Sequence, residues 1–236
     1  MKTCALIVAA GASRRLGGAV PKQFREVCGK PLLSWTIGRF EKASSIDDIV
    51  VVVAEEHLLY ASEKIIDPFA FHKVSKIVPG GESRRESVLK GLERLPISTG
   101  LVAVHDGARP FVAPGDIDRV VLLAAKDKAA ILAARATDTV KRAEQGYIFA
   151  TLSRESLFLA QTPQVFGYDI IIAAHRQVAA EAANGADEMG FTDDASLIEA
   201  RGLKIRIVEP EHPNMKVTTA DDLKLASLLL AQEKDE

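Results

Sequence analysis

The chain has 236 residues, enough for one α/β domain with a sizeable core, and we expect no second domain. Its 30 basic and 32 acidic residues give a net charge of −2, a balance that predicts no surface for nucleic acid or anionic membranes. The two cysteines are too few for a disulfide framework or a metal cluster. The chain starts without a basic and apolar leader and has no run of membrane-spanning length, so we expect a cytoplasmic protein.

The first 30 residues combine a buried strand, a glycine turn and several cations. Residues 3–9 form an apolar run typical of a strand covered on both faces of a parallel sheet. We expect Gly11 to permit a turn that other residues resist, so that main-chain N–H groups face an anion such as a phosphate. Solvated loop arginines would explain the cations equally simply. Between residues 11 and 30 there are five of them, against one acid: Arg14, Arg15, Lys22, Arg25 and Lys30.

Neither the Walker phosphate loop nor the GxGxxG dinucleotide fingerprint occurs in this stretch. Residues 9–16, AAGASRRL, followed by Pro21-Lys22-Gln23, instead resemble the signature of nucleotidyltransferases that activate sugar or polyol phosphates. The stretch is most similar to the 2-C-methyl-D-erythritol 4-phosphate cytidylyltransferase family. The resemblance implies that Arg15 and Lys22 are catalytic. It also implies nucleotide contacts from Ala9, Ala10, Gly11 and Ala12.

The rest of the chain alternates strands with helices, as βαβ units do. We expect strands at 49–54, 74–78, 101–104, 129–134, 203–208 and 215–217, and helices at 32–44, 55–66, 84–95, 115–126, 168–184 and 219–232. The resemblance implies a Rossmann-like three-layer nucleotidyltransferase fold, with a mostly parallel twisted sheet, helices on both faces and a protruding β-arm. We therefore expect a single nucleotidyltransferase domain spanning residues 1–236.

A second glycine turn, residues 79–81, enters the helix expected from residue 84. Ser83 and Glu86 fit a capping box, which alone would explain both side chains. The alternative interpretation is that the glycine backbone and the helix start hold part of a nucleotide. In the resembling family this segment contacts the cytosine base. The resemblance thus implies nucleotide-binding roles for Gly81, Glu82, Arg84 and Ser87.

The strand at 101–104 delivers residues 105–110, HDGARP, to the sheet edge where ligands bind in open α/β folds. Asp106 fits an Asp-Gly turn paired with Arg109, and it fits equally a carboxylate that holds Mg²⁺ against triphosphate oxygens. The resemblance implies the second role, with Gly107 at the nucleotide and Arg109 positioning the other substrate. The family has Ala at position 107, so Gly107 offers no side-chain contact there.

Residues 137–154 predict a β-hairpin with Gly146 in its turn. An isolated hairpin is barely stable in water, so it should pack against something. In the resembling family this arm forms a homodimer and reaches the partner's site. The resemblance implies that Thr139 and Arg154 position the sugar-phosphate substrate there, whereas a solvated surface hairpin is the interpretation without it.

The last third of the chain contributes two further candidates. Residues 161–166, QTPQVF, match a family motif where the arm returns to the body. Thr192 or Asp193 is a good N-cap for a helix that opens near residue 193. The resemblance implies that Thr192 helps to position the substrate and that Lys216 contacts its phosphate.

The reaction implied by the resemblance joins CTP to 2-C-methyl-D-erythritol 4-phosphate and releases pyrophosphate, with Mg²⁺ as the cofactor. The attacking phosphate is already ionised at neutral pH, so the work is positioning and charge neutralisation. One alternative is ribitol 5-phosphate as the acceptor. A non-catalytic nucleotide sensor would keep the glycine turns without needing both Arg15 and Lys22, and a dehydrogenase would need the missing fingerprint.

Overall fold

The computed structural model describes residues 1–11, 20–184 and 190–235. At its centre lies a seven-stranded sheet with the order β11-β7-β10-β6-β1-β4-β5. Each pair is parallel except the two that involve β10. The strands are β1 (Lys2–Val8), β4 (Asp48–Val53), β5 (Val74–Pro79), β6 (Thr99–Asp106), β7 (Ala129–Arg135), β10 (Phe158–Gly167) and β11 (Arg206–Val208).

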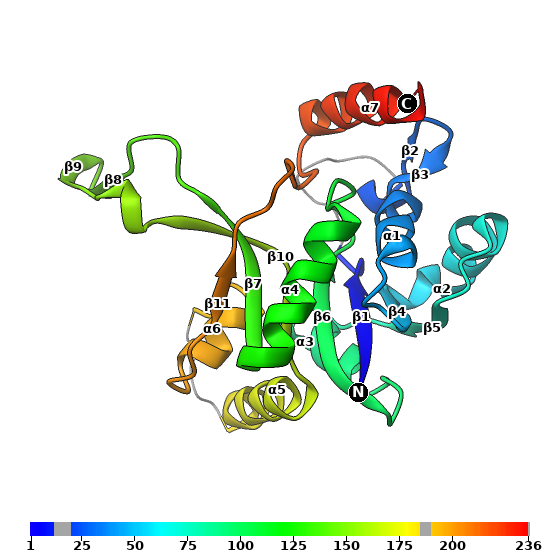
Figure 1. Cartoon of the computed structure of the whole chain (residues 1–236), viewed down its shortest axis with the longest axis horizontal. Coiled ribbons are helices and arrows are strands. Elements are labelled where there is room, and N and C mark those ends of the chain that lie inside the picture. The colour runs from blue at the N-terminus through cyan, green and yellow to red at the C-terminus, as the bar shows by residue number, and fades with distance from the viewer. Residues whose placement is uncertain (12–19, 185–189, 236) are drawn as a thin grey trace.

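Helices cover both faces of this sheet, which confirms the three-layer fold (Figure 1). On one face lie α1 (Leu32–Lys42) and α4 (Pro114–Asp127). On the other lie α3 (Arg84–Leu92), α5 (Tyr168–Ala183) and α6 (Asp194–Glu199). Successive residues of β1 are buried against opposite layers, Ala5 in the first and Leu6 in the second. This two-sided burial explains why β1 is apolar without alternation.

A smaller apolar cluster lies at the carboxyl edge of the sheet. Helix α7 (Ala220–Asp235) packs there against the short ribbon of β2 (Glu26–Val27) and β3 (Lys30–Pro31) (Figure 1). The cluster consists of Val27, Leu32, Phe111, Val217, Ala226 and Leu230. Burial of Val217 in it holds the segment before α7 against the main body.

Strand β10 is the main feature that the sequence prediction missed. Residues 161–166 were expected only as the return from the arm, but they form a strand between β6 and β7, antiparallel to both. Pro163 has no N–H to donate and is unusual in a central strand. It sits where the pairing with β7 is irregular, between Ala160 and Gln164. The proline therefore masked a strand that the irregular register accommodates.

Other element predictions need correction. The helix expected at 55–66 is a series of short turns: a 3-10 turn (Glu55–His57), α2 (Leu58–Ala61), a π-helical turn (Ser62–Ile66) and another 3-10 turn (Asp67–Phe69). Helix α3 ends at Leu92 rather than near residue 95, and β11 starts only at Arg206. Residues 215–217 form no strand; the Val217 N–H instead donates to Ala108 O at 2.8 Å.

The predicted hairpin is present as β8 (Lys141–Glu144) and β9 (Tyr147–Thr151), and Figure 1 shows it projecting from the body. Its turn has positive φ at Gln145 (51°) and Gly146 (85°). Two such residues in a two-residue turn match the right-handed twist of the flanking strands. None of the described helices is long and apolar enough to cross a membrane.

Candidate functional site

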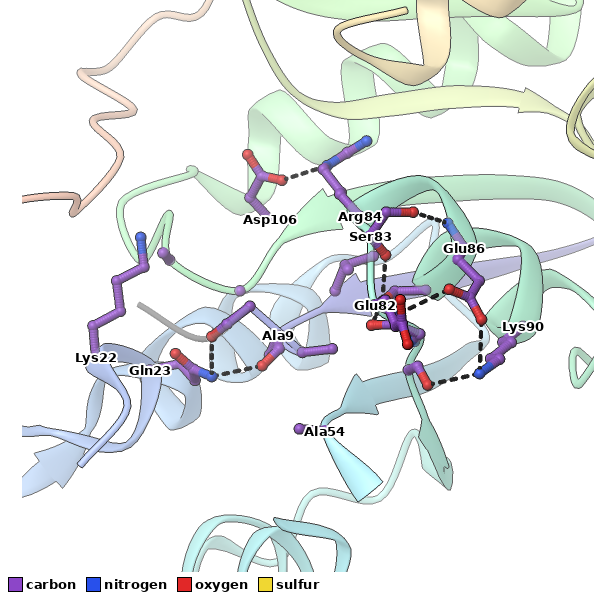
Figure 2. A pocket seen from close by; sticks show the side chains of 18 of the residues that line it. Ala9, Lys22, Gln23, Ala54, Glu82, Ser83, Arg84, Glu86, Lys90 and Asp106 are labelled. Atoms are coloured by element: carbon purple, nitrogen blue, oxygen red, sulfur yellow. Dashed lines mark hydrogen bonds and ion pairs between the residues drawn. The ribbon is translucent and has the colours of Figure 1, made fainter. Parts of the chain in front are cut away.

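A cavity of about 730 Å³ lies at the carboxyl ends of β1, β4, β5 and β6. This volume is within the range of small-molecule sites. The chain leaves β1 through α1 on one face and enters β6 from α3 on the other, so the cavity sits at the switch point of the sheet. Figure 2 shows Lys22 and Gln23 at one side of it and Glu82, Glu86 and Lys90 at the other.

Gln23 holds the end of β1 in place. Its side chain is buried, and its Nε2 donates to Ala9 O at 2.7 Å and to Gly11 O at 3.2 Å (Figure 2). Gly11 lines the cavity but has no positive φ, and a Cβ there would meet no atom of the described residues within 4 Å. The expectation that its backbone needs glycine is therefore wrong. Close approach of a ligand remains as a reason for the missing side chain.

Of the five cations predicted near this turn, Lys22 lines the cavity, and its Nζ donates to Val217 O at 2.8 Å. Arg14, Arg15 and Ala12 lie outside the described residues. The other two, Arg25 and Lys30, do not line the cavity. Arg25 Nε donates to Val20 O at 3.3 Å, and Lys30 Nζ lies 5.0 Å from the centroid of the Trp35 ring. Of the three cations of this stretch that the structure describes, only Lys22 therefore lines the cavity.

The second glycine turn both caps α3 and lines the cavity. Ser83 Oγ accepts from the Glu86 N–H at 3.1 Å, and the Glu86 carboxylate accepts from the Glu82 N–H at 2.9 Å. Ser87 Oγ accepts from the Gly81 N–H at 3.0 Å. The capping interpretation is confirmed, and Gly81, Glu82 and Ser87 line the cavity as well. The two interpretations are therefore compatible.

Gly80 brings the two glycine turns together. A Cβ at this position would lie 2.4 Å from the Ala10 Cβ and 2.9 Å from Ser87 Oγ. Such distances exclude any side chain without movement of the β1 turn or of α3. The cavity wall at this point consequently consists of backbone.

Asp106, at the end of β6, is surrounded by cations. Its Oδ2 accepts from Lys216 Nζ at 2.7 Å, its Oδ1 accepts from Arg84 Nε at 3.2 Å, and Arg109 Nε lies 3.6 Å from Oδ2. Burial by itself would raise the pKa of Asp106, but the charges of Arg84 and Lys216 outweigh it and hold the pKa well below its usual range. The group is therefore a carboxylate at neutral pH. The predicted pair with Arg109 exists but is the longest of the three contacts.

Arg109 anchors the segment before α7 instead of lining the cavity. Its guanidinium donates to Asn214 O at 2.7 Å, and Asn214 Nδ2 donates to Thr162 O of β10 at 2.8 Å. Lys216, two residues further on, does line the cavity. The structure thus brings Lys216 to the site and leaves Arg109 behind its wall. Gly107 also lines the cavity, and a Cβ there would lie 2.9 Å from the Ala9 Cβ.

Besides Arg109, three predicted residues do not line this cavity. Thr139 and Arg154 belong to the exposed arm, where an Arg154 guanidinium N–H donates to Thr137 O at 2.7 Å (Figure 1). Thr192 lies just before α6. Because the first two were predicted to act in a partner's site, one chain does not test them.

Several residues at or behind the site were not predicted, among them Gln23, Lys90, Thr162, His175 and Asp194. The Asp106 N–H donates to Thr162 Oγ1 at 3.1 Å, and Arg84 forms an ion pair with Asp194 at 2.8 Å. Thr162 belongs to the motif at 161–166, which matched the family in sequence but was assigned no role in the site. Asp194 directly follows Asp193, the N-cap of α6. Because capping was sufficient to explain an acidic pair at a helix start, the sequence did not predict that Asp194 pairs with Arg84.

The donor set at the site fits a cation that arrives with a nucleotide. Among the described residues, no group of three or more His, Cys, Asp or Glu side chains could hold a metal ion. Asp106 offers one carboxylate at the cavity, and Mg²⁺ characteristically takes one or two carboxylates with phosphate oxygens and water. His105 is no candidate base, because burial lowers its pKa to about 3 and its Nε2 lies 3.1 Å from Arg109 O.

Sequence comparison extends over nearly the whole chain. The profile of the 2-C-methyl-D-erythritol 4-phosphate cytidylyltransferase family matches residues 3–232. The chain is 42% identical over 230 residues to the enzyme of that name from Pelotomaculum thermopropionicum, with 97% of this chain and 94% of that protein covered. It is 40% identical over 238 residues to its namesake in Geotalea uraniireducens, with 100% of both covered.

Solved structures agree with the sequence matches. The 4-diphosphocytidyl-2C-methyl-D-erythritol synthase of Anaerococcus prevotii superposes with a TM-score of 0.83 at 28% identity, covering 98% of this chain and 96% of that one. The 2-C-methyl-D-erythritol 4-phosphate cytidylyltransferase of Thermus thermophilus gives a TM-score of 0.75 at 32% identity, covering 98% and 100%. The fold of this chain thus has counterparts of known structure over nearly its whole length.

Proposed function

Because the chain belongs to the 2-C-methyl-D-erythritol 4-phosphate cytidylyltransferase family, we propose that it transfers a cytidylyl group from CTP to 2-C-methyl-D-erythritol 4-phosphate, releasing pyrophosphate. The observation that carries the proposal is the cavity at the switch point of the sheet, which Lys22, Lys216 and the carboxylate of Asp106 line together. Two cations and a metal-binding acid at one sheet edge suit a reaction between two phosphates.

The nucleotide would occupy the space between the two glycine turns. The base would lie against residues 80–83, where the wall is backbone and Glu82 and Ser87 stand nearby. The triphosphate would lie against the β1 turn, whose shape Gln23 maintains. Gly80 supports this placement because it leaves the cavity open between the turns.

Asp106 would hold Mg²⁺, and the ion would neutralise charge on the triphosphate when bound. Lys216 and Arg84 compensate the carboxylate in the present structure. Both cations line the cavity and are therefore also within reach of phosphate groups there. Arg84 is suited to bidentate phosphate contact and Lys216 to the point charge of a lysine.

In the proposed reaction, a phosphate oxygen of the acceptor attacks the α-phosphorus of CTP and pyrophosphate leaves. No general base is needed, because that phosphate is already ionised. Lys22, together with Arg15 outside the described residues, would stabilise the charge that develops on the α-phosphate and pyrophosphate. Lys216 would hold the phosphate of the acceptor.

The arm would complete the acceptor site in a homodimer. On β9, Tyr147 is 81% exposed, Ile148 69% and Phe149 61%, which is unusual for large apolar side chains. A second copy of the chain would cover them, and Thr139 and Arg154 would then reach the acceptor bound to the partner. Arg109 and Thr192 would support the acceptor from the chain's own side. We propose that the reaction takes place in the cytoplasm.

The test is pyrophosphate release from CTP and Mg²⁺ with either 2-C-methyl-D-erythritol 4-phosphate or ribitol 5-phosphate. We expect release with the methylerythritol substrate and background rates with ribitol 5-phosphate. Release with ribitol 5-phosphate alone would mean that ribitol 5-phosphate is the acceptor, while the proposed mechanism would be unchanged. CTP binding without release on either acceptor would make the chain a nucleotide sensor.

A further inference from the structure

A line of charged side chains runs from the cavity into the layer of α5 and α6. Arg84 lines the cavity and uses two different nitrogens, Nε toward Asp106 (3.2 Å) and an Nη toward Asp194 (2.8 Å). Behind it, Asp194 Oδ1 accepts from His175 Nε2 at 3.0 Å. Since an ionised carboxylate can only accept, this contact assigns the proton of His175 to Nε2.

Burying the Asp194 carboxylate has an unfavourable desolvation free energy. Its side chain is 1% exposed and that of His175 is fully buried. Burial by itself would raise the pKa of Asp194, but Arg84 and then His175 outweigh it and keep the carboxyl ionised. A buried ion pair of this kind contributes little net stability compared with apolar packing. The position that the ion pair gives to Arg84 therefore explains the pair better than a contribution to folding stability does.

The position of Asp194 is determined by contacts of its two neighbours, Asp193 and Ala195, with α6 and with β10. Asp193 caps α6 by accepting from the Ser196 N–H at 3.0 Å. Gln164 of β10 donates to the Asp193 carboxylate at 2.7 Å and accepts from the Ala195 N–H at 2.9 Å. Residues on both sides of Asp194 are thus tied to the central sheet, so its carboxylate is a rigid support.

We infer that Asp194 is a positioning residue for Arg84. It holds the guanidinium at the cavity wall, and His175 holds Asp194 in the orientation that this requires. Without Asp194, Arg84 has Asp106 as its remaining carboxylate partner among the described residues and rotates onto it. Arg84 is then lost as a phosphate ligand. The inference rests on the proposed CTP site and deepens it.

The sign of the effect separates positioning from simple charge. Asp194→Asn removes a negative charge near an anion site, so electrostatics at a distance alone predicts tighter CTP binding. Loss of positioning predicts weaker binding, by about 10-fold to 100-fold as for other orienting partners. The KM of the acceptor should stay within about twofold, since Arg84 is assigned to the nucleotide.

The experiment is CTP binding by titration calorimetry with the full chain, for Asp194→Asn and for Asp116→Asn as the matched control. Asp116 is also 1% exposed, also lies at a helix start, and pairs with Arg119 at 2.9 Å away from the cavity. We expect weaker CTP binding in Asp194→Asn and unchanged binding in Asp116→Asn. Unchanged or tighter binding in a folded Asp194→Asn protein would overturn the inference.

Arg84→Ala and the double variant Arg84→Ala/Asp194→Asn, together with Asp194→Asn and the wild type, form a double-mutant cycle. If Asp194 acts through Arg84, the double variant binds CTP as weakly as Arg84→Ala alone. Additive losses would mean that Asp194 acts by another route. Normal CTP binding by Arg84→Ala would count instead against the proposed nucleotide site, so the two failures are distinguishable.

A pair of variants at His175 covers the case in which Asp194→Asn does not fold. His175→Gln keeps an N–H donor near the position of Nε2, whereas His175→Leu fills the space without one. We expect near-normal CTP binding for His175→Gln and several-fold weaker binding for His175→Leu. Equal binding by the two would contradict a role for His175 in holding Asp194.

Discussion

At the scale of single residues, the clearest prediction is the effect of removing the Lys22 ammonium on kcat. It lines the cavity, and its Nζ contacts the carbonyl of Val217, one residue after Lys216. If it stabilises charge in the transition state, Lys22→Ala should lower kcat by about 10²-fold to 10³-fold, the usual cost of one preorganised donor. Pyrophosphate release under saturating substrates measures it.

Lys30→Ala is the control for that variant. Lys30 belongs to the same basic segment, but its ammonium lies over the Trp35 ring, away from the cavity. Its loss should leave kcat unchanged. A Lys22→Ala protein that is folded and turns over normally would remove Lys22 from the mechanism.

At the scale of elements, α3 packs so closely on the sheet that Gly91 cannot carry a side chain. A Cβ there would lie 2.5 Å from Leu6 Cδ1 and 2.9 Å from Val52 Cγ2, both in fully buried strand residues. Gly91→Ala gains about 1 kcal/mol of helix propensity and loses about 1–3 kcal/mol to overpacking. We expect a net loss of up to about 2 kcal/mol in the free energy of unfolding, measured by urea denaturation.

Gly115→Ala in α4 provides the comparison. Gly115 is exposed and helical, and among the described residues no atom lies within 4 Å of a Cβ built there. The helix-propensity gain should then stand alone, up to about 1 kcal/mol of added stability. Stabilisation by both alanines would show that α3 can shift away from β1 and β4.

The start of α7 should make stability depend on pH. The hydroxyl and N–H of Thr218, with the N–H of Thr219, donate to the Asp222 carboxylate and lower its pKa from 3.8 to about 2. A lowered pKa stabilises the fold above the pKa of the unfolded chain, and this contribution is lost as the pH falls through the folded value. The stability gap between wild type and Asp222→Ala should thus be constant above about pH 5 and shrink between about pH 4 and 2.

Urea denaturation at several pH values measures that gap. Asp221→Ala is the neighbouring control, because Asp221 is 89% exposed and has Lys224 as its ion-pair partner. Surface pairs of this kind contribute little, so Asp221→Ala should show no such pH-dependent gap. A gap for Asp222→Ala that persists at low pH would mean that packing, and not the carboxylate, stabilises the helix start.

At the scale of the whole molecule, the proposed site spans two subunits. Lys22→Ala and the double variant Thr139→Ala/Arg154→Ala should each be nearly inactive, since each lacks one half of the site. In a random mixture half of the dimers are hybrids, and each hybrid has one intact site. Co-expression should therefore restore about a quarter of the active sites.

A third substitution decides how the recovery arises. Phe149→Glu places a charge among the exposed apolar side chains of β9, and in the arm of either partner it should abolish both dimer formation and the recovered activity. Size-exclusion chromatography with light scattering gives the oligomeric state. No recovery from hybrids that do form would mean that Thr139 and Arg154 do not act in the acceptor site of the partner.

Local chemistry predicted much of this protein. Apolar runs located β1, β4 and β7, because strands buried on both faces carry their signal in consecutive residues. The first glycine turn and Asp106 were each placed at the carboxyl end of a strand, where ligands bind in open α/β sheets. Their union with the second glycine turn in one nucleotide site was implied by the family resemblance, and all three line the same cavity. The acceptor and the cytidylyl reaction came from a family resemblance, which the comparisons confirmed at the level of the family.

Contacts between distant segments were decided only in the folded chain. Pro163 disguised β10, because an irregular register that tolerates proline has no signature in sequence. Arg109 had the right charge but anchors the segment before α7, since packing directs a side chain and composition does not. The support of Arg84 by Asp194 joins residues 110 positions apart in sequence, a pairing that only the packing of α3 against α5 and α6 creates.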